Sequence, residues 1–291
     1  MMNVTAFDFG QADSFLVRGG KKDSPANVLI DCGSKKYIGT GLFEKLRMKN
    51  VKELDLLIIT HIHQDHVGYL SELARSIKIK RAVFPYSQRS ERLWEMTEDE
   101  ETRSQLRLLY EAENILSCSK TEMLFTDNLP DFFPIYLSGL KLSLIYPSKT
   151  CNLSFLTKLK DRGKGESRED ENILRLINGD SSVWHIEDEE GRRALFCGDC
   201  FEENFADRYF EFCRKNNSDE KINFLKLSHH GRNDKGHVYF SNKFVKRLRP
   251  DKILITNTEE NFRKSASSYE KFLKESILIK AGEKVSEVEI A

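Results

Sequence analysis

The sequence predicts an α/β fold with many strands and with helices on the outside, and three observations carry this prediction. Residues 55–60 form a continuous apolar run, which is typical of a strand buried on both faces. Residues 67–77 place their apolar side chains on one helical face. Short β-rich segments bounded by glycine or other turn residues recur along the chain. Because no internal repeat and no linker divides the sequence, we expect a single domain over residues 1–291.

The remaining elements follow from the same patterns. The expected strands cover residues 4–9, 14–18, 27–31, 55–60, 80–86, 135–137, 140–146, 182–187, 194–197, 224–227 and 252–255. The expected helices cover residues 42–48, 67–77, 203–215 and 269–276. A charged stretch at 89–117 also favours a helix, inside a helical insertion at 89–134. Residues 158–171 are polar and contain glycine, which predicts a mobile loop.

The composition favours a soluble globular protein, with 39% hydrophobic and 32% charged residues. The 46 basic and 46 acidic residues balance, which argues against bulk attraction to nucleic acid or membrane and leaves room for a local basic groove. The sequence contains no apolar run of about 18 residues, so we expect no membrane span. Residues 1–9 do not resemble a signal peptide, and the six cysteines are scattered. We therefore expect reduced thiols and a cytoplasmic location.

The strongest chemical signal lies at residues 60–66, which read THIHQDH directly after the apolar strand. His61 and His63 can aim two imidazoles at one point, while Asp65 and His66 can serve a second centre at the start of the next helix. In α/β sheets, the segments that leave the strand ends present reactive side chains. Imidazole and carboxylate donors together suit Zn²⁺, Mn²⁺ or iron. The segment therefore predicts a metal site.

Four further segments extend this signal, namely residues 7–14 (FDFGQADS), 30–33 (IDCG), 195–199 (LFCGD) and 225–231 (LKLSHHG). Together with residues 60–66, and in this order, they resemble the motifs of the metallo-β-lactamase fold across nearly the whole chain. Within this fold, the chain is most similar to the hydrolase domain attached to the bacterial DNA-uptake competence channel and to its free-standing relatives. The resemblance implies an αββα sandwich, in which two mixed β-sheets pack face to face with helices outside.

The resemblance also implies a role for each matching residue. The implied metal ligands are His61, His63, Asp65, His66, Asp199 and His230. Asp31 is expected to receive a ring N–H of a ligand histidine. Asp199 ends an apolar strand, and its carboxylate can bridge two cations about 3.5–4 Å apart. One of His229 and His230 is expected to be a ligand and the other a supporting or substrate-contacting group, and we favour His230 as the ligand.

One departure from the family pattern concerns the first metal. Most members supply a further histidine before the Gly-Asp motif, and Asn178 stands here in its place. The competence-channel subgroup also has Asn and Ser in this region. We therefore expect two divalent ions, Zn²⁺ or Mn²⁺, with weak binding at the first. His185 is an imperfect substitute that we interpret as a sheet histidine, and His237 fits a surface position. Asn178, His185 and His237 are nevertheless retained as candidate substrate contacts.

The expected chemistry is hydrolysis of a phosphodiester, in DNA or in another substrate. Two cations would lower the pKa of a shared water from about 15.7 toward about 7 and stabilise the developing negative charge. Asp65 would act chiefly as a ligand, and His229 or His237 could give a proton to the leaving oxygen. The first alternative is another small-molecule hydrolase, acting on a cyclic nucleotide, a phosphocholine ester, a lactone, a thioester or an amide. The second is a non-enzymatic, metal-stabilised module that binds a protein partner through the 89–117 helix.

Two groups of basic residues could contact a nucleic-acid backbone. One group lies in the expected loop and comprises Lys158, Lys160, Arg162, Lys164 and Arg168. The other flanks a helix and comprises Lys243, Lys246, Arg247 and Arg249. Both groups also fit ordinary solvated charge, and neighbouring acidic residues offset the first. The sequence leaves the oligomeric state open.

Overall fold

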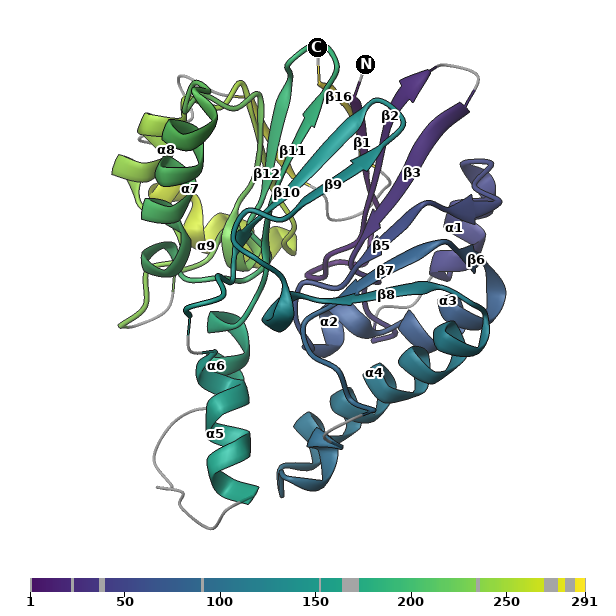
Figure 1. Cartoon of the computed structure of the whole chain (residues 1–291). Coiled ribbons are helices and arrows are strands. Elements are labelled where there is room, and N and C mark those ends of the chain that lie inside the picture. The colour runs from purple at the N-terminus through teal and green to yellow at the C-terminus, as the bar shows by residue number, and fades with distance from the viewer. Residues whose placement is uncertain are drawn as a thin grey trace.

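The computed structural model describes residues 2–21, 24–36, 40–89, 92–151, 153–163, 173–233, 236–269, 277–280 and 286–290. Within these residues, two seven-stranded sheets pack face to face, with helices on both outer sides (Figure 1). The predicted αββα sandwich is confirmed. A further pair of short parallel strands, β4 (Glu53–Leu54) and β6 (Lys78–Ile79), lies beside the first sheet.

The two sheets share one plan, in which part of each sheet is antiparallel and part is parallel. The first sheet has the order β16 (Ser286–Ile290), β1 (Met2–Ala6), β2 (Phe15–Lys21), β3 (Ser24–Ile30), β5 (Leu56–Ile58), β7 (Arg81–Phe84), β8 (Glu122–Phe125). The second has the order β15 (Ile277–Lys280), β14 (Lys252–Ile255), β13 (Phe224–Lys226), β12 (Arg193–Phe196), β11 (Val183–Asp188), β10 (Leu140–Tyr146), β9 (Pro134–Leu137). The strands from β3 to β8 and from β12 to β15 run parallel.

Strand β5 explains the continuous apolar run in the sequence. Leu56 and Ile58 belong to the hydrophobic core between the two sheets, whereas Leu57 belongs to the core beneath the helices. Successive side chains of a strand point to opposite faces, so both faces of β5 must be apolar. The rings of Phe15 and Phe196 lie 5.5 Å apart and connect the two sheets across the inner core.

The described helices are α1 (Leu42–Met48), α2 (Gln64–Val67), α3 (Leu70–Ser76), α4 (Glu100–Cys118), α5 (Ser154–Gly163), α6 (Ile173–Gly179), α7 (Glu202–Asn216), α8 (Asn242–Leu248) and α9 (Glu259–Tyr269). None of them combines the length and the apolar character needed to cross a bilayer. Helix α4 begins where Asp99 accepts a hydrogen bond from the Thr102 backbone N–H at 2.7 Å. This side chain caps the free N–H groups of the first turn.

Three sequence predictions differ from the structure. The helix expected at 89–117 begins only at residue 100, and the 89–134 insertion also contributes strand β8 to the first sheet. The mobile loop expected at 158–171 is helical up to residue 163, in α5, and residues 164–171 lie outside the described residues. The helix expected at 269–276 is likewise outside them after residue 269, whereas α9 before it was not predicted. Helical periodicity is short and interrupted by polar residues in both α5 and α9, which hides it in the sequence.

Candidate metal centre

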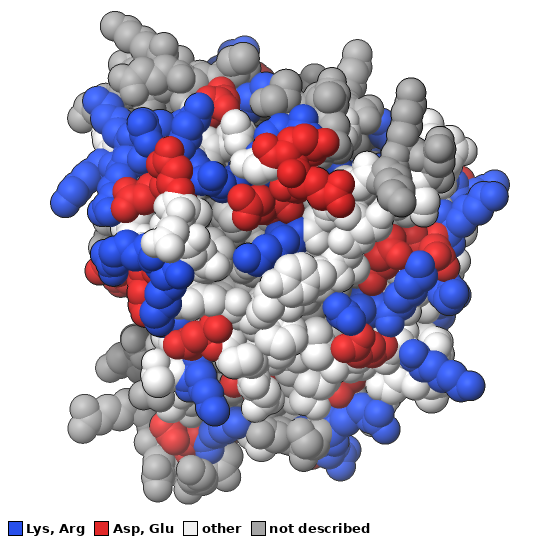
Figure 2. All heavy atoms as spheres, turned by 45° about the horizontal axis from the view of Figure 1, so that its top comes forward, with Lys and Arg blue, Asp and Glu red and all other residues white. Residues whose placement is uncertain are grey.

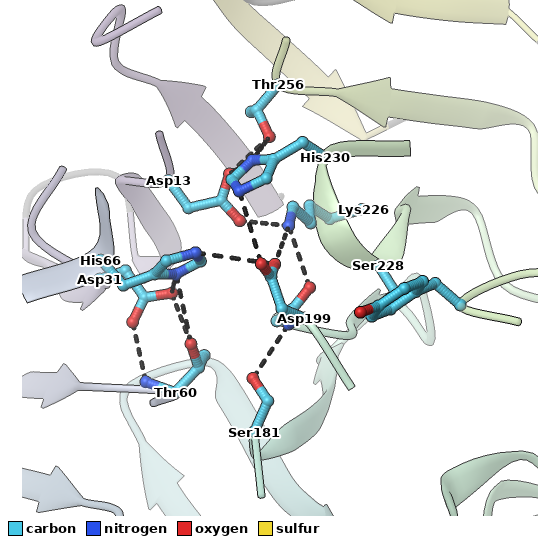
Figure 3. Close-up of polar contacts among 12 residues, drawn as sticks. Asp13, Asp31, Thr60, His66, Ser181, Asp199, Lys226, Ser228, His230 and Thr256 are labelled. Carbon is cyan, nitrogen blue, oxygen red and sulfur yellow. Dashed lines mark hydrogen bonds and ion pairs between the residues drawn. The ribbon is translucent and has the colours of Figure 1, made fainter. Parts of the chain in front are cut away.

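The predicted metal ligands lie where the two sheets meet. Residues 60–66 leave β5 of the first sheet, and Asp199, His230 and Thr256 follow β12, β13 and β14 of the second. The segments are joined directly, because the Ser182 N–H donates to the Thr60 carbonyl at 2.9 Å. The carboxyl ends of parallel strands gather at one edge of a sheet, so this edge collects reactive groups from both halves of the chain. Figure 3 shows His66, Asp199 and His230 pointing toward one another.

His61 and His63 form what we call the first centre. His61 Nε2 and His63 Nδ1 lie 3.1 Å apart, and both residues are held by the turn between β5 and α2. His61 Nδ1 lies 3.1 Å from the hydroxyls of both Thr60 and Ser181. The Thr60 hydroxyl donates to Asp31, so it can accept a hydrogen bond from the His61 Nδ1–H. The tautomer with a proton on Nδ1 leaves a lone pair on His61 Nε2 for a metal.

Asp65, His66 and His230 form the second centre. His230 Nε2 lies 3.1 Å from Asp65 Oδ2. His66 Nδ1 lies 2.8 Å from the Asp31 carboxylate, which can only accept, so the proton resides on Nδ1. The Nε2 atom of His66 therefore faces the site with its lone pair when the ring is neutral. This is the support for a ligand histidine that the sequence predicted for Asp31.

Asp199 lies between the two centres. Its carboxylate oxygens are 3.9 Å from His61 Nε2, 3.6 Å from His66 Nε2 and 3.5 Å from His230 Nε2. The preceding Gly198 has a φ of +50°, and a Cβ there would lie 2.3 Å from the Ser181 hydroxyl. Only glycine therefore permits the turn that presents Asp199, which is the physical reason for a Gly-Asp motif.

The motif after β13 has an unusual backbone. His229 and His230 both adopt left-handed conformations, with φ of +49° and +54°. Such conformations are rare outside glycine and cluster at functional sites. The turn directs His230 into the second centre, where its Nδ1 lies 3.1 Å from the Thr256 hydroxyl. His229 instead faces the cavity and places its ring 4.0 Å from that of Tyr239.

The donor set fits divalent cations. His66 Nε2, His230 Nε2 and Asp199 Oδ1 are buried and make no hydrogen bond of suitable geometry with the described residues, although His230 Nε2 lies near Asp65. Buried polar atoms normally have a partner, so three such atoms facing one space indicate a missing ligand. Imidazole nitrogen and carboxylate oxygen are donors that zinc, manganese and iron accept. Two sets of donors are close enough to share an ion: His61 with His66 and Asp199, and Asp65 with His66 and His230.

Burial and neighbouring charge shift the pKa values of the histidines in opposite directions in the two centres. Burial lowers the pKa of His61 well below its ordinary value and lowers the pKa of His63 to about 4. Burial acts in the same direction on His66 and His230, but nearby carboxylates outweigh it. Asp31 and Asp199 raise the pKa of His66 well above its ordinary value, and Asp199 and Asp13 raise that of His230 to about 9. Without a cation, the second centre therefore balances its carboxylates with protons, which a metal would displace.

A buried ion pair under the second centre was not predicted. Lys226 contacts Asp13, donates to the Gly198 carbonyl at 3.1 Å and lies 3.7 Å from Asp199. Asp13 Oδ1 is also 3.2 Å from His230 Nδ1 (Figure 3). The pair therefore connects the backbone and ligand side chains of the centre. A signal existed in the sequence, because Lys226 lies inside an otherwise apolar strand, where an unpaired lysine would be costly.

The metal centre opens into a cavity of about 680 Å³. His63, Asp65, Asp199 and His230 contribute to its lining, and Asn178 from α6 lines it as predicted for a substrate contact. His185 and His237 are not among the lining residues. His185 is buried in β11 with its ring 5.0 Å from that of Phe212, and burial lowers its pKa to about 3. The ring of His237 stacks on Phe201. The structure thus contradicts both as substrate contacts in this cavity.

Comparison with known proteins agrees with this geometry. The model of the metallo-beta-lactamase superfamily matches residues 7–234. Over 97 residues, the chain is 37% identical to ComE operon protein 3 of Bacillus subtilis (strain 168), covering 28% of this chain and 12% of that protein. Over 74 residues, it is 42% identical to the anti-Pycsar protein Apyc1 of Paenibacillus sp. (strain J14), covering 24% of this chain and 29% of that protein. The matched part thus spans less than a third of either relative.

Solved structures share the fold at low sequence identity. CmlA, a diiron β-hydroxylase from Streptomyces venezuelae, has a TM-score of 0.55 and 13% identity, with coverage of 99% of this chain and 54% of that one. The metallo-beta-lactamase fold protein YhfI from Bacillus subtilis has a TM-score of 0.53 and 11% identity, with coverage of 99% and 100%. The superfamily model matches most of this chain, and the matched residues carry the motifs and adopt the fold. The chain therefore belongs to the metallo-beta-lactamase superfamily of metal-dependent hydrolases.

Proposed function

We propose that the protein hydrolyses phosphodiesters with two divalent cations, one held by the first centre and one by the second, with Asp199 between them. One observation carries the proposal. Three buried ligand atoms that make no hydrogen bond of suitable geometry, from His66, His230 and Asp199, face one another at the base of a cavity. When bound, a pair of divalent cations supplies an activated water and holds both oxygens of an in-line displacement at phosphorus.

The chain's own residues hold the reactants in place. Asp31 and Thr60 fix the orientation of His66 and His61, and Gly198 fixes that of Asp199. Arg175 and Lys36 line the cavity and give it positive charge for a phosphate group. Such fixed groups lower the barrier because they need no reorganisation during the reaction.

His229 is the proposed proton donor to the leaving oxygen. Its backbone N–H donates to the Gly198 carbonyl at 3.1 Å, which places it beside Asp199. Its half-buried side chain lines the cavity, outside both metal centres. A histidine in this position can protonate a leaving alkoxide, a contribution of about 10²–10⁴-fold. Asp65 lies in the second centre and serves as a ligand.

The two groups of basic residues outside the cavity do not single out nucleic acid as the substrate. On the face shown in Figure 2, Lys and Arg side chains alternate with Asp and Glu. Within the basic group at 243–249, Arg247 pairs with Glu220 and Arg249 lies 3.1 Å from Asp219. Of the other basic group, Lys158, Lys160 and Arg162 lie in α5, whereas Lys164 and Arg168 lie outside the described residues. DNA therefore stands as one member of the proposed phosphodiester class.

The test combines metal analysis with turnover of bis(p-nitrophenyl) phosphate in Mn²⁺ or Zn²⁺. The variant His63→Ala/Asp65→Ala should lose metal from both centres and roughly 10³-fold in rate, since the cations supply several kcal/mol of charge stabilisation. A matched control, His237→Ala/Asp251→Ala, changes the same residue types outside the cavity and should keep the wild-type rate. Equal rates in the wild type and the His63→Ala/Asp65→Ala variant would refute the proposal. Metal binding without diester turnover would instead favour a non-enzymatic binding module.

A further inference from the structure

Two amide side chains lie on the walls of the cavity, apart from the metal centre. Gln105 comes from α4 and Asn178 from α6, and both line the cavity. They are 3% and 5% exposed, so each is more than nine-tenths buried. The two helices lie at the same end of the sandwich in Figure 1. The cavity is therefore flanked by buried amides from two separate parts of the chain.

Each amide presents an acceptor that lacks a partner. Asn178 Oδ1 and Gln105 Oε1 are buried and have no hydrogen-bond partner within the part of the chain that the structure describes. The Asn178 Nδ2 group donates to the Tyr239 hydroxyl at 3.1 Å, so the oxygen is the end of this amide that lacks a partner. A buried carbonyl oxygen without a donor is unfavourable, and at these two positions, which line the cavity, a bound molecule can supply that donor.

The rest of the cavity indicates what that molecule is. A volume of about 680 Å³ lies within the range of roughly 300–1,000 Å³ that small-molecule sites occupy. Arg175 and Lys36 can bind phosphate oxygens, which accept hydrogen bonds and cannot satisfy a carbonyl oxygen. A donor that a phosphodiester offers to Gln105 or Asn178 therefore belongs to its organic part.

We propose that Gln105 and Asn178 determine specificity, by selecting small phosphodiesters whose organic group carries hydroxyl or amine donors, such as a nucleoside. This inference rests on the proposed phosphodiesterase function. The phosphate lies at the metal centre with Arg175 or Lys36, and the organic group extends between α4 and α6. A site built to receive hydrogen bonds discriminates strongly against analogues that lack the donor, because its buried acceptors then stay unpaired.

The test compares two chromogenic diesters that release the same p-nitrophenol. Thymidine 5′-monophosphate p-nitrophenyl ester carries a hydroxyl and a ring N–H, whereas bis(p-nitrophenyl) phosphate carries no donor. In the variants Asn178→Leu and Gln105→Met, the ratio of kcat/KM for the nucleoside ester to kcat/KM for the bis-aryl ester should fall roughly threefold to tenfold, the value of one hydrogen bond. Gln88→Met is the matched control, because Gln88 is a buried glutamine that does not line the cavity, and it should keep the wild-type ratio.

Three outcomes would overturn the inference. If both variants leave the ratio at the wild-type value, neither amide contacts a donor of the substrate. If Asn178→Leu lowers the two rates equally and also reduces the metal content, Asn178 serves the metal in place of the missing histidine. A wild-type preference for duplex DNA over the nucleoside ester would equally exclude a small-molecule substrate.

A binding measurement separates this inference from the proposed function. Thymidine 5′-monophosphate and phenyl phosphate are titrated calorimetrically into the metal-loaded protein. Both variants should bind the nucleotide roughly threefold to tenfold more weakly relative to phenyl phosphate. If neither diester is hydrolysed but this difference is present, the proposed function fails and the selectivity stands. If hydrolysis is present and the difference is absent, the selectivity fails and the proposed function stands.

Discussion

The two centres that meet at Asp199 are supported in different ways. In the second centre, the Nδ1 atoms of His66 and His230 face buried carboxylates, Asp31 at 2.8 Å and Asp13 at 3.2 Å. A carboxylate fixes the tautomer of a ligand histidine and makes it a stronger donor.

The first centre lacks this kind of support among the described residues. His61 Nδ1 faces two hydroxyl groups, those of Thr60 and Ser181, and the position of the usual third histidine is taken by Asn178. Hydroxyls orient an imidazole but add little to its donor strength. The two centres therefore differ in the residues that support their ligand histidines as much as in the number of ligands. For this reason we expect the second centre to bind metal more tightly than the first.

The largest expected effect comes from the residue that the two centres share. The variant Asp199→Ala should lose metal from both centres and lower phosphodiester hydrolysis by roughly 10³-fold. Metal content by elemental analysis and rates with bis(p-nitrophenyl) phosphate provide the check. Retention of a full complement of one ion would show that Asp199 serves a single centre and is no bridge.

The ion pair beneath the second centre should contribute to folding as well as to metal binding. In Lys226→Met, Asp13 keeps a buried charge without its cation, which should cost about 3–5 kcal/mol of unfolding free energy. The double variant Asp13→Asn/Lys226→Met removes both charges and should recover much of this loss. Urea denaturation of the metal-free proteins measures both. An unchanged midpoint in Lys226→Met would mean that the pair carries no stability.

The supporting residues provide the direct comparison of the two centres. Asp31→Asn should weaken metal binding at the second centre by roughly 10–100-fold, the usual effect of losing a carboxylate behind a ligand histidine. Ser181→Ala removes one hydroxyl from His61 and should weaken the first centre only about threefold to tenfold. Competition titration with a chromogenic chelator gives both constants. Equal losses would show that hydroxyl and carboxylate supports are equivalent here.

Lowering the pH should weaken metal binding at the second centre and leave metal binding at the first centre unchanged. In the metal-free protein the pKa of His230 is raised to about 9 and that of His66 is also raised, so metal must displace protons at neutral pH. The pKa of His63 is lowered to about 4, so the first centre is neutral there. From pH 8 to pH 7, affinity at the second centre should fall about tenfold for each proton displaced, while that of the first stays constant. Calorimetry in buffers of different ionisation enthalpy counts the protons, and a count of zero would contradict the prediction.

The sequence predicted the parts of the site that lie in short motifs. Residues 60–66, Asp199 and His230 lie together as the five motifs implied, because each follows a strand that ends at the same edge. The contacts of Asp13 and Ser181 were beyond such reasoning, although Asp13 lies in the first of the motifs. Their contacts with His230 and His61 join residues 217 and 120 positions apart, and only the packing of the sheets brings them together.

The same limit applies to the fold. Buried strands such as β5 are recognisable because burial on both faces imposes an apolar run. Gln105 could not be assigned to the cavity, since its position depends on where α4 packs and not on its own neighbours in sequence. Helix α5 was interpreted as loop because its polar residues outnumber its apolar ones, although Phe155 and Leu159 pack into the core.

The position of the metal centre between the two sheets has a consequence for how the protein is made. A ribosome releases His61, His63 and His66 before Asp199 and His230, which lie more than about 130 residues further along the chain. The hydrogen bond from Thr256 to Asp13 closes a loop of 243 residues behind His230. A nascent chain can therefore hold an ion with one set of histidines at first, and the complete centre forms only when the second sheet packs on the first. Metal occupancy would then mark molecules that have finished folding.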